Sequence, residues 1–237
     1  MLPTYKDEAG YSQMFKDTPA LRVRSSGRCR KIINVAKIGA GQKLLEIGCG
    51  LGDYADLINK QTGAEIIGLD QSQLFIDQAR VRHPQTQLTF RAASALAMPF
   101  AAASFDLVYG NGILHHLPDK IKLFKEIGRV LKNKGKIVFL EPNICNPAAY
   151  LIFRSFIRKF AQLEPTEDLF TRAEIIKNLT AAGFSGIKII PVDFILPITP
   201  EFLIKVNVAL DKILEKTFLL KQLSQSILIY AEKNSNQ

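Results

Sequence analysis

The stretch KLLEIGCGLGDYADLINKQTGAEIIGLDQS, residues 43–72, decides how the chain is organised. Its apolar start predicts a buried strand, and glycines then alternate with other residues over positions 48–52, where a helix should open. A second apolar run at residues 65–70 ends on a carboxylate. A strand, a glycine turn that opens a helix and a second strand together are typical of a nucleoside-binding βαβ unit.

The spacing of the glycines separates this turn from a dinucleotide-binding turn. A dinucleotide fingerprint has glycines at its first, third and sixth places, whereas here they stand at the first, third and fifth, and Asp53 takes the sixth. A carboxylate at the start of the helix would repel a pyrophosphate, which normally lies against the positive helix end. The ligand is therefore expected to carry an adenosine without phosphates.

Two carboxylates narrow the choice of ligand further. Glu46 lies inside the first predicted strand, and because buried carboxylates are rare without a partner, a cationic ligand would suit it. Asp70 ends the second strand, at the place of the acid that binds ribose hydroxyls, with Gln71 expected beside the adenine. S-adenosylmethionine fits both, since it combines a ribose diol with an ammonium group, a carboxylate and a sulfonium.

Four segments, in order, resemble the motifs of class I S-adenosylmethionine-dependent methyltransferases, in the branch that acts on small molecules, quinones and lipids. The alternative, a tight turn whose Asp70 only caps a helix, explains each motif alone but not their combination. The resemblance implies an α/β fold with a doubly wound, seven-stranded, mostly parallel sheet, helices on both faces, a terminal antiparallel hairpin and helical lid additions. The four segments are residues 44–54, 66–72, 96–117 and 130–143.

The resemblance also implies the residues that contact the donor, with S-adenosylhomocysteine as the product. Ser94 stands where the family usually has an Asp that receives the adenine amino group, so the backbone N–H of Ala95 or a water is expected to assist. Glycines around Asn111 let the backbone approach the methionine portion. The expected donor-binding residues are Glu46, Gly48, Cys49, Gly50, Gly52, Tyr54, Asp70, Gln71, Ser94, Ala95 and Asn111.

Two adjacent histidines, His115 and His116, follow the fourth predicted strand, where the strand ends of an open α/β sheet surround a ligand. They are candidates for a general base, and the alternative is a pair that caps backbone and packs. A zinc site is disfavoured, because adjacent side chains point apart and no third ligand is near in sequence, so no metal is predicted. Methyl transfer requires alignment above all, and a base only when the acceptor must lose a proton.

The chain is basic, with a formal net charge of +9 over 237 residues. Such a charge is compatible with nucleic acid, an anionic membrane surface or an acidic substrate. The basic side chains ahead of the first strand sit at many helical angles, which favours an ordinary solvated helix face for most of them. They are Arg22, Arg24, Arg28, Arg30, Lys31, Lys37 and Lys43.

The whole chain, residues 1–237, is expected to form one methyltransferase domain. Within it we predict an N-terminal helical lid at 1–40, a donor-binding core at 41–145 and substrate-side helical insertions at 146–170 and 195–224. Three scattered cysteines show no disulfide or zinc spacing, and the polar N-terminus lacks the apolar centre of a signal peptide, so a cytoplasmic protein is expected.

Two predicted helical regions carry more apolar surface than their connections need. Residues 150–163 combine an apolar face with basic residues, which is compatible with a membrane surface and also with packing on the protein itself. Residues 199–220 are expected to form a pocket wall or lid, with a dimer contact or a bilayer contact as alternatives. The sequence leaves the oligomeric state open.

The predicted function is methyl transfer from S-adenosylmethionine to an oxygen, nitrogen or carbon atom of a small or lipid-like acceptor. The alternative is an inactive donor-binding or partner module with the same fold. Ser94, in place of the Asp that the family usually has, is the observation that favours it. Nucleic acid is disfavoured, because residues 110–113 read Gly-Asn-Gly-Ile where enzymes acting on base amino groups carry Asn or Asp before Pro-Pro-aromatic. Protein substrates stay open.

Overall fold

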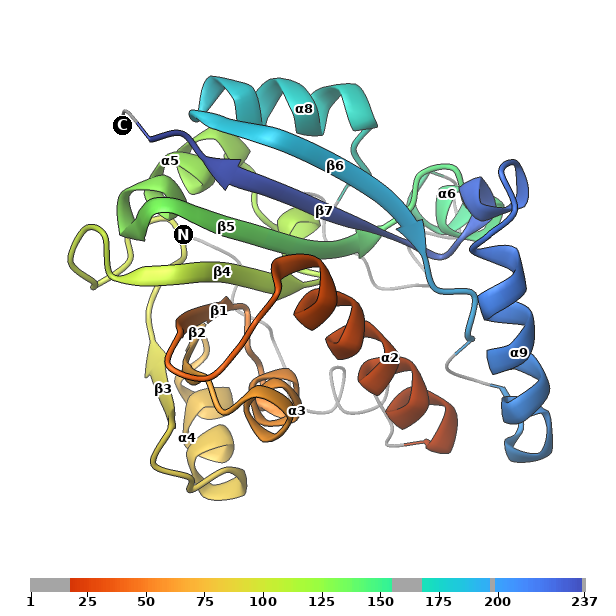
Figure 1. Ribbon diagram of the computed structural model, residues 1–237, viewed down its shortest axis with the longest axis horizontal. Helices are drawn as coiled ribbons and strands as arrows, with labels where there is room; N and C mark the ends of the chain where they lie inside the picture. Colours follow the sequence, from red (N-terminus) through yellow and green to blue (C-terminus); the bar gives the residue numbers. More distant parts are fainter. Residues whose placement is uncertain (1–17, 155–167, 197–198, 236–237) are drawn as a thin grey trace.

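The computed structural model describes residues 18–154, 168–196 and 199–235. Their strands form one sheet in the order β3-β2-β1-β4-β5-β7-β6, in which β1 to β5 pair in parallel and β7 runs antiparallel to both β5 and β6. The sheet confirms the predicted fold class. The strands are β1 (Lys43–Ile47), β2 (Glu65–Asp70), β3 (Leu88–Ala92), β4 (Phe105–Asn111), β5 (Leu131–Pro142), β6 (Phe184–Val192) and β7 (Ser226–Lys233) (Figure 1).

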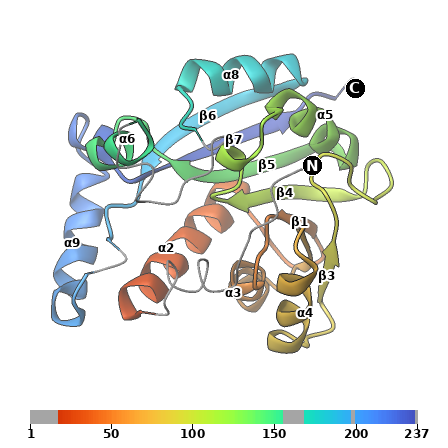
Figure 2. The same ribbon diagram turned by 180° about the vertical axis from the view of Figure 1, so that it is seen from behind.

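Helices cover both faces of the sheet (Figures 1 and 2). Alternate strand residues pack to opposite sides, so Leu45 joins a core with α5 and α8, whereas Leu44 joins a second core with α2, α3 and α4. Burial on both faces is why the strands read as continuous apolar runs. The helices are α2 (Pro19–Ala36), α3 (Asp53–Thr62), α4 (Gln73–Arg82), α5 (Lys120–Val130) and α8 (Arg172–Ala181).

The remaining helices lie beyond the ends of β4 and β5, at the edge of the sheet where a ligand is expected (Figure 1). Among the described residues, no helix combines the length and the apolar character that crossing a bilayer requires. These helices are the 3₁₀ turns η1 (Leu114–His116), η2 (Glu201–Leu203) and η3 (Leu220–Leu223), and the α-helices α6 (Pro147–Arg154) and α9 (Ile204–Leu214).

The fifth strand begins earlier than the sequence predicts. The apolar run predicts a fifth strand over residues 137–140, but β5 already pairs with β4 at Leu131, and the register shifts before pairing resumes at Lys136. Lys134 has a positive φ of 59° within this irregularity, so the polar stretch ahead of Gly135 departs from regular strand geometry. Residues 1–17 and 155–167, which include parts of the predicted lid and basic helix, lie outside the described residues.

Candidate active site

The glycine turn between β1 and α3 is fixed by backbone conformation and by close packing. Gly48 and Gly52 have φ values of 68° and 82°, a region that disfavours residues with a side chain. A Cβ on Gly48 would lie 2.7 Å from Ile113, and one on Gly52 would lie 2.6 Å from Phe90. The turn therefore needs glycine at both positions, as the sequence pattern predicts.

Asp70 ends β2 beside this turn. One carboxylate oxygen accepts a hydrogen bond from the backbone N–H of Gly50 at 2.9 Å, and the other accepts one from Ser72 at 2.9 Å. Burial raises the pKa of Asp70 above its usual value, and the backbone N–H groups oppose this shift. Each carboxylate oxygen has a further lone pair, so the group can still accept two hydroxyls. The residues present thus fit the ribose of an adenosyl ligand.

Glu46 has partners inside the protein. Its carboxyl is 2% exposed and accepts a hydrogen bond from the Tyr109 hydroxyl at 3.2 Å, and the backbone N–H of Ala55 also donates to it. Burial raises the pKa of Glu46 to about 8, so the group holds its proton at neutral pH. A cationic ligand is therefore not needed to explain an acid in this strand, and contact between Glu46 and the donor stays a prediction.

This buried acid predicts a specific dependence of stability on pH. The unfolded chain releases the proton near the ordinary pKa of glutamic acid, whereas the folded protein holds it up to about pH 8. The free energy of unfolding should therefore fall across this window, by up to about 1.4 kcal/mol per pH unit. Glu46→Gln replaces the titrating carboxyl with an amide that stays neutral. Urea unfolding should therefore show that the free energy of unfolding of the variant, relative to that of the parent, is higher at pH 8 than at pH 5. A parallel pH dependence of the two proteins would contradict the assignment.

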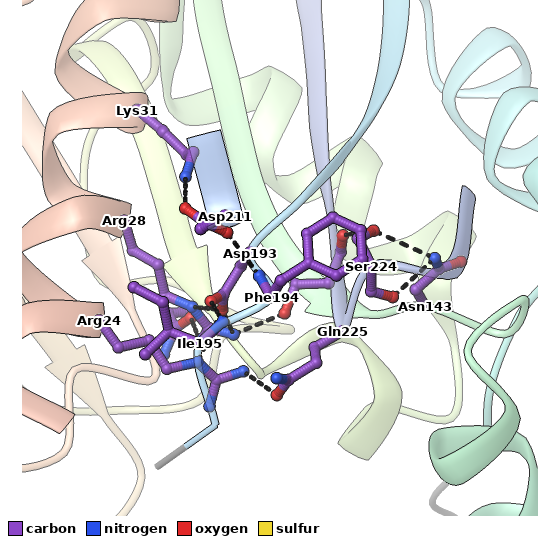
Figure 3. Close-up of polar contacts among 12 residues, drawn as sticks. Arg24, Arg28, Lys31, Asn143, Asp193, Phe194, Ile195, Asp211, Ser224 and Gln225 are labelled. Atoms are coloured by element: carbon purple, nitrogen blue, oxygen red, sulfur yellow. Dashed lines mark hydrogen bonds and ion pairs between the residues drawn. The ribbon is translucent and has the colours of Figure 1, made fainter. Parts of the chain in front are cut away.

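A buried arginine connects α2 to the end of β4. Arg28 donates to Asn111 Oδ1 at 2.9 Å and to Asp193 Oδ2 at 2.8 Å, and the Tyr54 side chain also hydrogen-bonds with it. Arg24 donates to the same oxygen of Asp193 at 2.7 Å (Figure 3). Burial alone would raise the pKa of Asp193, but the two arginines hold it below its usual value.

Arg24 and Arg28 are exceptions to the solvated helix face that is predicted for most of these basic side chains. Their side chains are only 14% and 13% exposed, and both are paired with Asp193. Tyr54 and Asn111, which the sequence places in the site separately, meet on Arg28. The physical reason is a carboxylate from the distant connection after β6, which stabilises two guanidinium groups out of water.

The histidine pair lies on the other side of β4, where His115 meets Glu141 from the end of β5. His115 Nδ1 is 2.7 Å from Glu141 Oε2, and the other oxygen of Glu141 accepts the backbone N–H groups of Ile113 and Leu114 at 2.9 and 2.8 Å. Burial opposes ionisation of Glu141, but the bonds from His115, Leu114 and Ile113 hold its pKa below the usual value. His116 stacks on His115 with ring centroids 4.1 Å apart.

The charge of Glu141 fixes the proton on His115. An ionised carboxylate only accepts hydrogen bonds, so Nδ1 must be the donor in this pair. The neutral ring then carries its free lone pair on Nε2, which is the arrangement of a general base with an orienting carboxylate. Among the described residues, no group of three His, Cys, Asp or Glu side chains is placed to hold a metal ion.

The remaining residues that are predicted to bind the methyl donor lie in or near the same strand ends. Ala93, just after β3, donates its backbone N–H to Asp70 O at 2.8 Å, which brings the next two residues towards the turn. Ser94 Oγ accepts the backbone N–H of Leu96 at 3.2 Å, and Ala95 is half-buried. Gln71 is exposed directly after β2. Cys49 is 7% exposed, and burial raises the pKa of its thiol.

Sequence reasoning did not assign Arg28 to the site, and it placed Glu141 only in a segment that borders the substrate, without a role of its own. Glu141 carried a usable signal, because it follows an apolar run just as Asp70 does, and an acid at a strand end points into the ligand edge. Arg28 carried none, since nothing local distinguishes it from its basic neighbours. Its partner Asp193 is 165 positions away.

Known methyltransferases resemble this chain in sequence. Residues 45–139 match the family model described as a methyltransferase domain. The demethylmenaquinone methyltransferase of Lactobacillus johnsonii is 33% identical over 142 residues, which are 57% of this chain and 58% of the relative, so less than two thirds of that protein is matched. The demethylmenaquinone methyltransferase of Lactococcus lactis is 30% identical over 170 residues, which are 62% of this chain and 68% of the relative.

A solved structure shows the same fold. Phosphoethanolamine N-methyltransferase 2 of Haemonchus contortus, in complex with phosphomonomethylethanolamine and S-adenosylhomocysteine, superimposes with a TM-score of 0.67 at 20% identity. The match covers 95% of this chain and 56% of that one. With this sheet, the family match and the identity to the Lactococcus relative, the chain belongs to the class I S-adenosylmethionine-dependent methyltransferases.

Proposed function

We propose that the chain transfers the methyl group of S-adenosylmethionine to an oxygen, nitrogen or carbon atom of a small, lipid-like acceptor. Membership of the family supports the reaction, and two demethylmenaquinone methyltransferases among the relatives support an acceptor of this kind. The observation that carries the donor assignment is Asp70, whose carboxylate is held at the end of β2 beside the glycine turn with lone pairs to spare.

The residues of the turn and of the neighbouring strand ends bind and orient the donor. Asp70 accepts hydrogen bonds from the ribose hydroxyls, while Gln71, Ser94 and Ala95 border the adenine. Arg28 holds Asn111 in place at the end of β4. When bound, the donor supplies an electrophilic methyl group on a sulfonium, so the task of the protein is to align the acceptor and exclude water.

His115 acts as the general base for an acceptor that must lose a proton, such as a hydroxyl. Glu141 accepts the proton of Nδ1 in a hydrogen bond and leaves Nε2 to take the proton from the acceptor. Phe153 of α6 packs edge-on against the His115 ring with centroids 5.7 Å apart, so the first substrate-side insertion borders the base. We assign residues 146–170 and 195–224 to the acceptor side, where contact with a membrane surface would deliver such an acceptor.

The first experiment separates donor binding from methyl transfer. Titration calorimetry should show binding of S-adenosylhomocysteine and none of a dinucleotide or a nucleoside triphosphate, because Asp53 stands at the start of α3. Incubation with methyl-labelled donor and an extracted lipid pool should then label a lipid fraction. Donor binding without labelling of any fraction would favour the inactive module, and preference for a phosphorylated nucleotide would refute the assignment.

A further inference from the structure

Helix α9 and the turn after it separate their charges between two faces. The acidic side chains point inward: Asp211 is 7% exposed and accepts the backbone N–H of Phe194 at 2.6 Å, and Glu215 receives Lys31 Nζ at 2.8 Å (Figure 3 shows Lys31 and Asp211). The lysines are exposed on the outside. Over residues 204–216 the outward surface is thus positive, and the nearest exposed acid is Glu201, before the helix.

The same outward surface is apolar between the lysines. Phe202, Val206, Leu210 and Ile213 follow one another at intervals of three or four residues, which places them on one side of the helix. Phe202 is 81% exposed, and Phe218 and Leu219 beyond the helix are 79% and 75% exposed. Large apolar side chains gathered at this exposure mark an interaction site on a protein surface.

This surface continues to α6 and adjoins the candidate active site. Asn146, at the start of α6, donates to the backbone carbonyl of Leu223 at 2.7 Å, which ties α6 to η3. On α6 the side chains of Tyr150 and Leu151 are 54% and 50% exposed. Figures 1 and 2 both show α6 and α9 at one end of the molecule, the end at which β5 finishes. Glu141 is the next-to-last residue of β5.

We propose that α9, η3 and the start of α6 form a docking surface for an anionic phospholipid membrane. An apolar face flanked by lysines matches the acyl and headgroup layers of such a bilayer, with each lysine attracted to negative lipids. A second copy of the chain is a poor occupant, because the lysines of two copies would face each other with no outward acid on α9 between them. The inference builds on the proposed function, since docking would set the site against acceptors that reside in the bilayer.

Vesicle sedimentation with the full chain tests the docking surface. The protein should bind phosphatidylglycerol vesicles much more tightly than phosphatidylcholine vesicles, and less tightly as salt is raised. Phe218→Ser with Leu219→Ser should weaken binding at least about tenfold, because two apolar side chains no longer enter the bilayer. Lys212→Gln with Lys216→Gln should weaken binding to the anionic vesicles about 30-fold and leave the neutral vesicles unaffected.

Matched controls change the same chemistry elsewhere. Val81→Ser removes an apolar side chain that is 82% exposed on α4, and Lys122→Gln with Lys125→Gln removes two charges from α5. Both should bind vesicles like the parent. Equal losses in the controls, or no retention of the parent on anionic vesicles, would overturn the proposal. So would a dimer, detected by light scattering, that the Phe218→Ser and Leu219→Ser changes dissociate.

Calorimetry with S-adenosylhomocysteine keeps the two proposals separate. Unchanged donor affinity in the docking variants shows that they are folded, so that their vesicle binding reports on the surface alone. A parent chain that binds vesicles as expected but transfers no methyl group would support the docking surface and count against the proposed function. A chain that methylates a detergent-dispersed acceptor but does not bind anionic vesicles would support the proposed function and count against the docking surface.

Discussion

Asp70→Ala is expected to weaken S-adenosylmethionine binding about 100-fold or more. The carboxylate is assigned to both ribose hydroxyls, and each hydrogen bond to a charged group contributes roughly 1.5–3 kcal/mol. Titration calorimetry measures the loss directly. The backbone N–H groups of Gly50 and Ser72 lose their acceptor in this variant, so its thermal unfolding is measured together with donor binding.

The control for this change is Asp77→Ala on α4, which removes an equally charged side chain from an exposed position. It should bind the donor like the parent. If Asp70→Ala lowers the thermal stability too far, Asp70→Asn keeps one oxygen for the backbone while losing the charge. Donor affinity that is unchanged in a folded Asp70 variant would show that the ribose is bound elsewhere.

Glu141→Gln is expected to lower kcat for a hydroxyl acceptor about 100- to 10,000-fold, with donor affinity unchanged. The amide oxygen can still accept the N–H groups of Ile113 and Leu114, but the amide NH₂ then faces His115 Nδ1. The ring must accept there and carry its proton on Nε2, where it can no longer take a proton from the acceptor. Single-turnover kinetics with labelled donor measure the chemical step.

His115→Gln should cause a loss of similar size, and His116→Gln is the matched control, since it is the ring of His115 whose Nδ1 lies 2.7 Å from Glu141 Oε2. An orienting role for Glu141 also predicts that the pH profile of kcat changes in the Glu141 variant and not in the His116 variant. Full activity of His115→Gln on a hydroxyl acceptor would remove the base from the mechanism.

The donor half of the site could be predicted from sequence because its signals are local. Gly48, Gly52 and Asp70 lie within one βαβ unit, so their spacing alone predicts a turn and a strand end that meet. The same is true of His115, whose position after the fourth strand placed it at the ligand edge. Its partner Glu141 had the signal of an acid at a strand end, but only the structure shows the contact.

The long-range parts of the site could not be predicted from the sequence. Arg24 and Arg28 look like solvated side chains, and only the positive-φ connection that carries Asp193 makes them a buried pair. The first residues of β5 were also missed, because Leu131 is separated from the apolar run by a polar, irregular stretch. In each case the decisive partner comes from a strand or connection distant in sequence, which local periodicity does not report.

The ion pairs between α2 and the region of α9 connect the proposed docking surface to the donor site. Lys31 holds Glu215, and Arg28 holds Asp193 while also bonding to Tyr54 at the start of α3. If docking displaces α9, these contacts provide a path through α2 to α3, the helix that follows the glycine turn. Any such coupling would be reciprocal: the factor by which the lipid surface changed the affinity for the donor would equal the factor by which the donor changed the affinity for the lipid surface.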